Sequence, residues 1–166
     1  MQPGDTSPKF VHNLTQHEVA TMSEHRSTAV PARSDFRVWQ EIATRWHDND
    51  HYGHVNNAVY YAYFDTAISR FLIQAVGADV RNLEAIGLVA ETGCRYLAEL
   101  SFPDLLNVGI GLEKLGTSSV VYRLGVFREG AQAPVAVGRF VHVYVDRETH
   151  AVAKVPAPIR AALARL

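Results

Sequence analysis

The sequence has a single cysteine, no long apolar run and almost no net charge. Because Cys94 is the only cysteine among 166 residues, no disulfide can form within the chain. No window approaches the roughly 18 consecutive apolar residues of a membrane span, and the first thirty residues lack the basic-then-apolar order of a signal peptide. We therefore expect a protein that is neither exported nor inserted in a membrane, with a cytoplasmic location.

The charges also exclude several classes of partner. The 16 Lys and Arg residues and 17 Asp and Glu residues leave a formal net charge of −1, and the basic residues are scattered along the chain. Nucleic acids and acidic membrane surfaces require concentrated positive charge, so we expect neither as a partner. Apolar residues make up 48% of the chain and charged residues 20%, which is typical of a soluble globular protein with one sizeable core.

Two regions differ in pattern. Residues 1–34 contain several Ser and Thr residues and three prolines without a sustained hydrophobic period, which predicts a flexible N-terminal tail. From residue 35 to residue 166 the pattern is regular, and we expect one domain there. No internal repeat or second linker divides it.

A long helix is predicted from Asn57 to Val76, ending at Gly77. Apolar side chains cover most of its circumference and leave a thin polar stripe at Asp65, Thr66, Ser69, Arg70 and Gln74. A helix that is apolar on most sides is buried, so we expect the rest of the fold to wrap it.

Five strands are predicted around this helix, at residues 36–46, 88–100, 106–115, 118–128 and 134–146. Glycine-containing turns at 115–118 and 129–132 join the last three, and a short helix over 159–165 follows Pro156 and Pro158. The order indicates an α+β fold in which an antiparallel five-stranded sheet curls around one central helix. Such a sheet leaves an edge uncovered, so we expect at least a dimer.

The segment 45–64, RWHDNDHYGHVNNAVYYAYF, carries the chemistry of this chain. It places Asp50 in a glycine-containing turn directly before the helix, where unpaired backbone N–H groups stabilise negative charge. A carboxylate and such donors together can cleave an ester-like carbonyl. An aspartate before a helix often only caps backbone donors, and we expect Asp48 to have that turn or orienting role. Asn56 or Asn57 would suit the N-cap.

This stretch closely resembles the opening signature of hotdog-fold acyl-CoA thioesterases, in the branch named for 4-hydroxybenzoyl-CoA thioesterase. The resemblance lies in D-N-D-x-x-G-H-V-N-N-A-x-Y-x-x-Y-F-D at residues 48–65, and the segment 141–163 is also similar to that branch. It extends over residues 36–166.

The resemblance implies hydrolysis of a coenzyme A thioester without a metal or other cofactor. The family's catalytic carboxylate falls at Asp50, acting as nucleophile or as general base, and its oxyanion donor falls at the backbone N–H of Asn57. Family active sites lie between two subunits, which implies a homodimer or homotetramer. Substrate contacts are expected from the following residues around the helix start: His54, Asn56, Tyr60, Tyr61 and Asp65.

Other interpretations remain open at the level of sequence. His47, His51 and His54 alternate with carboxylates and could bind zinc or iron, although Gly53 argues against the helix that would align them. A protein of the same fold could instead hold an acyl thioester or a regulatory ligand without cleaving it. If Asp65 is buried it needs a partner, for which Ser69 or Arg70 of the same helix or a group on the partner subunit are candidates.

Overall fold

Five strands form one antiparallel sheet in the computed structural model, which describes residues 29–77 and 80–166. The sheet order is β1-β3-β4-β5-β2, and every neighbouring pair is antiparallel. The strands are β1 (Val38–Ala43), β2 (Ala85–Tyr96), β3 (Leu105–Leu115), β4 (Ser119–Arg128) and β5 (Ala136–Asp146). Residues 1–28 of the predicted tail lie outside the described residues.

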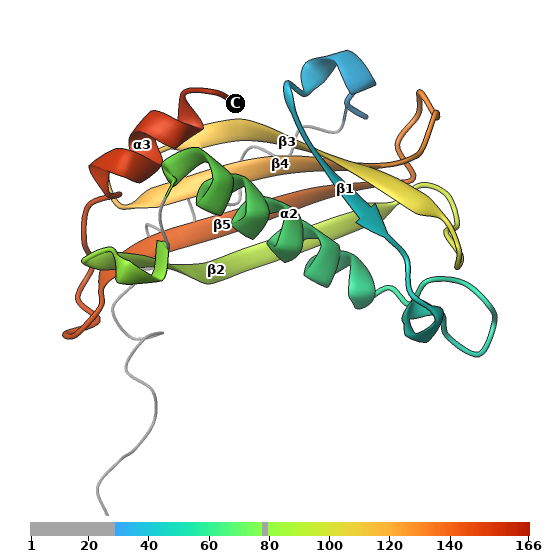
Figure 1. The fold of residues 1–166 in the computed structure, drawn as a ribbon, viewed down its shortest axis with the longest axis horizontal. Coiled ribbons are helices and arrows are strands. Elements are labelled where there is room, and N and C mark those ends of the chain that lie inside the picture. Colours follow the sequence, from blue (N-terminus) through green and yellow to red (C-terminus); the bar gives the residue numbers. More distant parts are fainter. Residues whose placement is uncertain (1–28, 78–79) are drawn as a thin grey trace, which may run out of the picture.

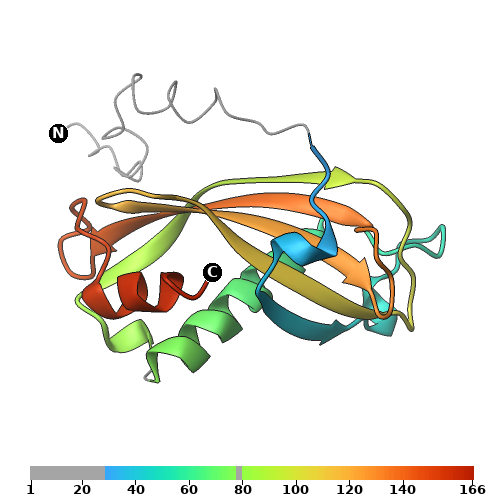
Figure 2. The same ribbon diagram turned by 90° about the horizontal axis from the view of Figure 1, so that it is seen from above.

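Helices α2 (Val59–Val76) and α3 (Ala157–Leu163) lie on the same side of this sheet (Figures 1 and 2). Short 3-10 turns occur at η2 (Arg33–Asp35), η3 (Trp46–Asp48) and η4 (Val80–Asn82). None of the described helices has both the length and the apolar character that a bilayer crossing requires. The predicted α+β hotdog fold, with five antiparallel strands, one long helix and a short C-terminal helix, is confirmed.

Helix α2 packs one face on the sheet and leaves the other face open. Its buried residues recur at helical spacing, as an amphipathic helix requires: Tyr60, Tyr63, Phe64, Ala67, Ile68, Phe71 and Leu72. Phe64 lies directly on β5, because a Cβ added at Gly138 would be 2.5 Å from its ring. On the other face Asp65, Arg70 and Ile73 are exposed. The sheet thus covers one side of α2, and the polar residues of its other side are exposed.

The C-terminal ends of two predicted strands were wrong for local reasons. The first strand ends at Ala43 rather than residue 46, because Thr44 turns to bond the carbonyl of Asp104 through its N–H and its hydroxyl. Strand β2 ends at Tyr96 rather than residue 100, because the N–H groups of Leu97 and Ala98 both donate to the carbonyl of Val135. The helix end was correct, since Gly77 adopts the left-handed conformation with φ of 68°.

The face of the sheet opposite α2 carries an aromatic cluster of its own. Phe36, Trp39 and Phe127 meet edge to face, with ring centroids 5.4 to 6.0 Å apart. Arg33 places its guanidinium 4.4 Å from the centroid of the Trp39 ring. Phe36 fits because Gly109 and Gly125 have no side chains beneath it. This cluster ties the start of the described chain to β3 and β4.

Strand β2 forms one edge of the sheet and is much longer than the opposite edge strand. It has 12 residues, against six in β1, and it pairs only with β5 within the described part of the chain. The pairing shifts between Val89 and Glu91, which marks a β-bulge near the middle of the strand. Most of one side of β2 is therefore available to pair with another chain.

Candidate active site

The loop between η3 and α2 is a small hairpin that presents Asp50. Asn49 and Val55 form an antiparallel bridge, and the Asp50 N–H donates to the His54 carbonyl at 2.8 Å. Gly53 closes the turn with φ of 87°, a conformation that favours glycine. This turn chemistry fixes the backbone on both sides of Asp50.

The Asp50 carboxylate is half-buried and is only partly used by its own loop. Its Oδ1 accepts the Tyr52 N–H at 2.8 Å and the His54 N–H at 3.4 Å. The other carboxylate oxygen, Oδ2, accepts no hydrogen bond from residues 29–77 or 80–166. One oxygen therefore holds the side chain in place while the second is available for chemistry.

The start of α2 lies beside this loop. Asn56 Oδ1 accepts the Ala58 N–H at 2.9 Å, and the Val59 N–H donates to the Asn56 carbonyl at 2.9 Å. The Asn57 N–H makes no hydrogen bond within the described residues, while its carbonyl accepts the Tyr96 hydroxyl at 2.9 Å. Asn56 thus satisfies a donor just before the helix, whereas the N-cap position itself falls at Ala58, so the prediction of an asparagine N-cap was wrong.

Asp50 and Asn57 are close in space because the bridge joins their segments. Asp50 lies one residue inside the Asn49–Val55 bridge and Asn57 two residues outside it. At about 3.3 Å per extended residue, their backbones lie on the order of 10 Å apart. The bridge therefore keeps Asp50 and Asn57 at the same end of α2.

Asp48 anchors the loop from beneath. Its side chain is 1% exposed and accepts the Arg45 N–H at 2.7 Å, the Arg45 guanidinium at 2.9 and 3.0 Å, and the Tyr63 hydroxyl at 2.7 Å. Burial acts to raise the pKa of this carboxyl, but the hydrogen bonds from Arg45 and Tyr63 outweigh it and leave the pKa lowered. Asp48 is thus an ionised, structural carboxylate, in the orienting role expected for it.

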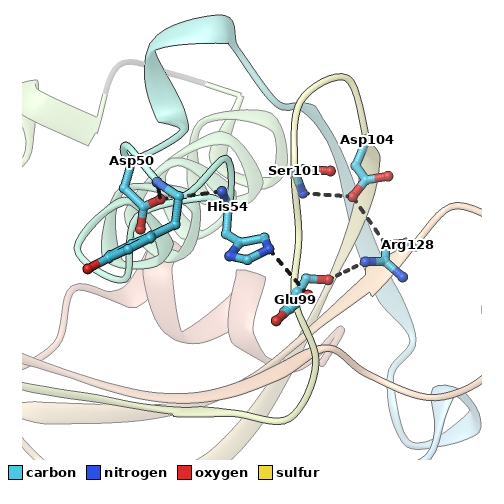
Figure 3. Close-up of polar contacts among 7 residues, drawn as sticks. Asp50, His54, Glu99, Ser101, Asp104 and Arg128 are labelled. Atoms are coloured by element: carbon cyan, nitrogen blue, oxygen red, sulfur yellow. Dashed lines mark hydrogen bonds and ion pairs between the residues drawn. The ribbon is translucent and has the colours of Figure 1, made fainter.

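A second set of contacts joins the Asp50 loop to the segment between β2 and β3 (Figure 3). His54 Nε2 lies 3.3 Å from the Glu99 carboxylate, and the Val55 N–H donates to the Leu100 carbonyl at 2.7 Å. Arg128 then binds both the Glu99 carbonyl and the Asp104 carboxylate, the latter at 3.1 Å. Through these contacts His54 helps to hold the Asp50 loop against the segment between β2 and β3.

The predicted substrate residues of α2 occupy different environments. Tyr60 is buried, meets the Tyr96 ring edge to face at 5.0 Å, and has a pKa raised by burial to about 12. Tyr61 is half-buried against Phe64. Asp65 is exposed on the open face of α2, and neither Ser69 nor Arg70 pairs with it among the described residues.

Arg70, offered as a partner for Asp65, donates to the Glu41 carbonyl instead. The histidine cluster is dispersed in a similar way, since the His51 ring packs on Tyr52 with centroids 3.8 Å apart and His54 points to Glu99. Across the residues that the structure describes, no three His, Cys, Asp or Glu side chains are grouped to hold a metal ion.

Two residues at this site were not predicted from the sequence. No contact was predicted for Tyr63, yet its hydroxyl binds Asp48 fifteen positions earlier. Tyr96 received no role, although its hydroxyl holds the Asn57 carbonyl from a separate strand. The tyrosine-rich helix offered a weak signal for Tyr63, whereas nothing near Tyr96 in the sequence indicates a contact across 39 positions.

A family model described as the thioesterase-like superfamily matches residues 44–163. The chain belongs to the thioesterase-like superfamily. This thioesterase-like protein is therefore a thioester hydrolase, as the sequence predicted.

Solved structures agree with this assignment. The PA5185 protein of Pseudomonas aeruginosa strain PAO1 is 46% identical, with a TM-score of 0.80 over 83% of this chain and 96% of that chain. PA2801 of Pseudomonas aeruginosa, described as a putative thioesterase, is 29% identical, with a TM-score of 0.70 over 77% of this chain and 98% of that chain.

BH1999 gentisyl-coenzyme A thioesterase shares the fold of this thioesterase-like protein. It is 22% identical, with a TM-score of 0.67 over 76% of this chain and 99% of that chain. At this identity the similarity extends to the fold and not to the substrate.

Proposed function

We propose that this protein hydrolyses acyl-CoA thioesters, with Asp50 as nucleophile or general base and the Asn57 N–H as oxyanion donor. The observation that carries the proposal is the pairing of an unoccupied carboxylate oxygen with an unoccupied backbone donor at the start of one helix. Both belong to a segment held by Asp48 and by the Glu99 contacts.

The first route is nucleophilic. The Asp50 oxygen attacks the thioester carbon, the C–S bond breaks, and coenzyme A leaves as a thiolate that takes a proton from water. Water then cleaves the resulting anhydride, releasing the free acid and restoring the carboxylate. In the second route Asp50 removes a proton from a water as that water attacks the same carbon. The C–S bond then breaks without a covalent enzyme intermediate, and the proton passes from Asp50 to the coenzyme A thiolate.

Both routes place negative charge on the thioester oxygen, and the first turn of α2 is suited to stabilise it. A fixed backbone N–H needs no reorganisation when the charge develops, and loss of one such donor in other enzymes costs about 2.7 to 4 kcal/mol. The Tyr96 hydroxyl on the Asn57 carbonyl restrains the peptide that follows this donor. His54, Asn56, Tyr60, Tyr61 and Asp65 are proposed to border the bound substrate.

We further propose a homodimer or homotetramer in which the free edge of β2 pairs with a second copy. Long edge strands with unpaired backbone groups are sites of such pairing. Assignment to the 4-hydroxybenzoyl-CoA branch and a cytoplasmic location are part of the same proposal. Because BH1999 is named a gentisyl-coenzyme A thioesterase, thioesters with a hydroxylated aromatic acyl group should be among the substrates tested.

The test is a hydrolysis panel of short, long, branched and aromatic acyl-CoA thioesters, followed by thiol release. We expect saturable hydrolysis of at least one class, unchanged after dialysis against a chelator. Binding of acyl-CoA without any thiol release would support the non-catalytic alternative and contradict the proposal. Loss of activity on chelation, restored by added metal, would instead favour a metal-dependent enzyme that uses the histidine cluster.

A further inference from the structure

His142 on β5 is a buried imidazole that the active-site account does not use. Its side chain is 7% exposed, and its Nδ1 has no hydrogen-bond partner among residues 29–77 and 80–166. Tyr122 and Phe140 meet the ring edge to face at 5.5 and 5.4 Å, so its orientation is fixed. A buried polar atom without a partner is costly, which suggests that something else supplies one.

The approach to this nitrogen passes over Gly87 of β2. A Cβ at Gly87 would lie 3.2 Å from His142 Nδ1 and 3.3 Å from the ring of Tyr144, so only the missing side chain leaves this nitrogen approachable. Gly87 itself is exposed on the free edge strand. The unpartnered nitrogen therefore faces the part of the molecule where a second copy is proposed to pair.

A two-fold axis through that edge would bring opposite ends of β2 together. Within one chain Gly87 and Tyr96 are nine residues apart, or about 30 Å along the strand. Antiparallel pairing of two copies of β2 reverses the second strand, so the Gly87 end of one copy lies beside the Tyr96 end of the other. Tyr96 binds Asn57, and His142 pairs with Val89 in the same half of β2 as Gly87, so such pairing would bring the proposed catalytic end of one copy toward His142 of the other.

We infer that His142 of one copy hydrogen-bonds the acyl group bound at Asp50 and Asn57 of the second copy, and so selects acyl groups that carry a hydroxyl or keto substituent. This inference rests on the proposed function. Burial lowers the pKa of His142 to about 4, so the ring is neutral at physiological pH. In the neutral ring Nδ1 accepts a hydrogen bond in one tautomer and donates one in the other, so this nitrogen suits either substituent.

The direct test compares matched acyl-CoA pairs that differ by one hydroxyl or keto group, such as benzoyl-CoA and 4-hydroxybenzoyl-CoA. We expect the wild type to favour the substituted member of at least one pair by about tenfold in kcat/KM, the value of one hydrogen bond. His142→Phe keeps a ring between Tyr122 and Phe140 and should abolish the preference. His142→Asn keeps a polar atom near the position of Nδ1 and should restore part of it.

Gly87→Ala provides a second variant, because its Cβ would obstruct the approach to Nδ1 without changing His142. It should also lose the preference. Gly93→Ala on the same strand is the matched control, since a Cβ there has no atom within 4 Å, and it should keep the wild-type ratio. An equal preference in wild type and His142→Phe would overturn the inference.

Mixed dimers test whether His142 acts across the interface. One copy carries Asp50→Asn and the other carries His142→Phe, and tandem affinity tags isolate the mixed species. The only working site then combines Asp50 of one copy with His142 of the other, so the wild-type preference should persist. A preference as low as that of the His142→Phe homodimer, or a monomeric protein in sedimentation, would contradict the inference.

A binding measurement separates failure of this inference from failure of the proposed function. If no thioester is hydrolysed, the proposed function is wrong, and calorimetry with the matched free acids then decides the inference alone. About tenfold weaker binding of only the substituted acid by His142→Phe would support it. Equal affinities in the two proteins would overturn it.

Discussion

Replacing Asp48 with Asn should destabilise the fold, although it changes no residue of the turn that holds Asp50. The Asp48 carboxylate is 1% exposed and accepts hydrogen bonds from the Arg45 N–H and the Tyr63 hydroxyl on one oxygen and from the Arg45 guanidinium on the other. An amide places an NH₂ group where one of these oxygens stood, so donors then face donors.

The magnitude follows from the buried contacts. Hydrogen bonds to a charged group contribute about 1.5 to 3 kcal/mol each, whereas the Arg45 side chain is 73% exposed and its ion pair adds little. Counting the Tyr63 hydroxyl and the Arg45 N–H, we expect Asp48→Asn to lower the free energy of unfolding by about 3 kcal/mol. The pKa of Asp48 is lowered, so this contribution is present above about pH 4 and is lost as the pH falls below that value.

Equilibrium urea unfolding at pH 7 measures this change as a lower midpoint at constant slope. Asp50→Asn is the matched control, because its Oδ1 can still accept the Tyr52 and His54 N–H groups, and it should change stability by less than about 1 kcal/mol. If Asp48→Asn unfolded at the wild-type midpoint, the anchoring role of Asp48 would be refuted. If the stability difference between wild type and Asp48→Asn did not shrink toward acid pH, the ionised state of Asp48 would be refuted.

Three further changes test other parts of the structure. Gly138→Ala would place a Cβ 2.5 Å from the Phe64 ring and should lower the free energy of unfolding in urea by about 1 to 3 kcal/mol. Gly93→Ala should lower it far less, because a Cβ there has no atom within 4 Å. Equal effects would contradict the close packing of α2 on β5. The pKa of His142 is lowered to about 4 in the folded state, so between pH 7 and pH 5 the unfolded state binds a proton that the folded state does not. Over this range the free energy of unfolding of the wild type should fall by about 2 kcal/mol more than that of His142→Phe. Burial raises the pKa of the Cys94 thiol to about 11, so iodoacetamide at pH 8 should label it far more slowly in native than in urea-unfolded protein.

Local sequence signals predicted the frame of the site. Gly77 ended the helix and Gly53 ruled out a helical loop, because both positions require a left-handed backbone. The placement of Asp50 in a turn before the helix also followed from residues within ten positions of each other. These are contacts that turn and capping chemistry determine without knowledge of the rest of the chain.

Long-range contacts could not be predicted in the same way. The Tyr96 hydroxyl bonds Asn57 and the Glu99 carboxylate contacts His54 only because of where β2 ends. That end is set by the N–H groups of Leu97 and Ala98, which both donate to the Val135 carbonyl. The exposure of Asp65 depends on the sheet covering only one side of α2. Composition shows that a helix is apolar, but the number of layers around it decides which of its polar residues remain in water.

The central claim is that Asp50 and the start of α2 act on one thioester carbon, and the kcat of Asp50→Asn tests it most directly. With the substrate that wild type hydrolyses best, and with unfolding shown to be unchanged, we expect thiol release to fall at least about 100-fold, because an amide is neither a nucleophile nor a base here. A kcat within a few fold of wild type would contradict the claim.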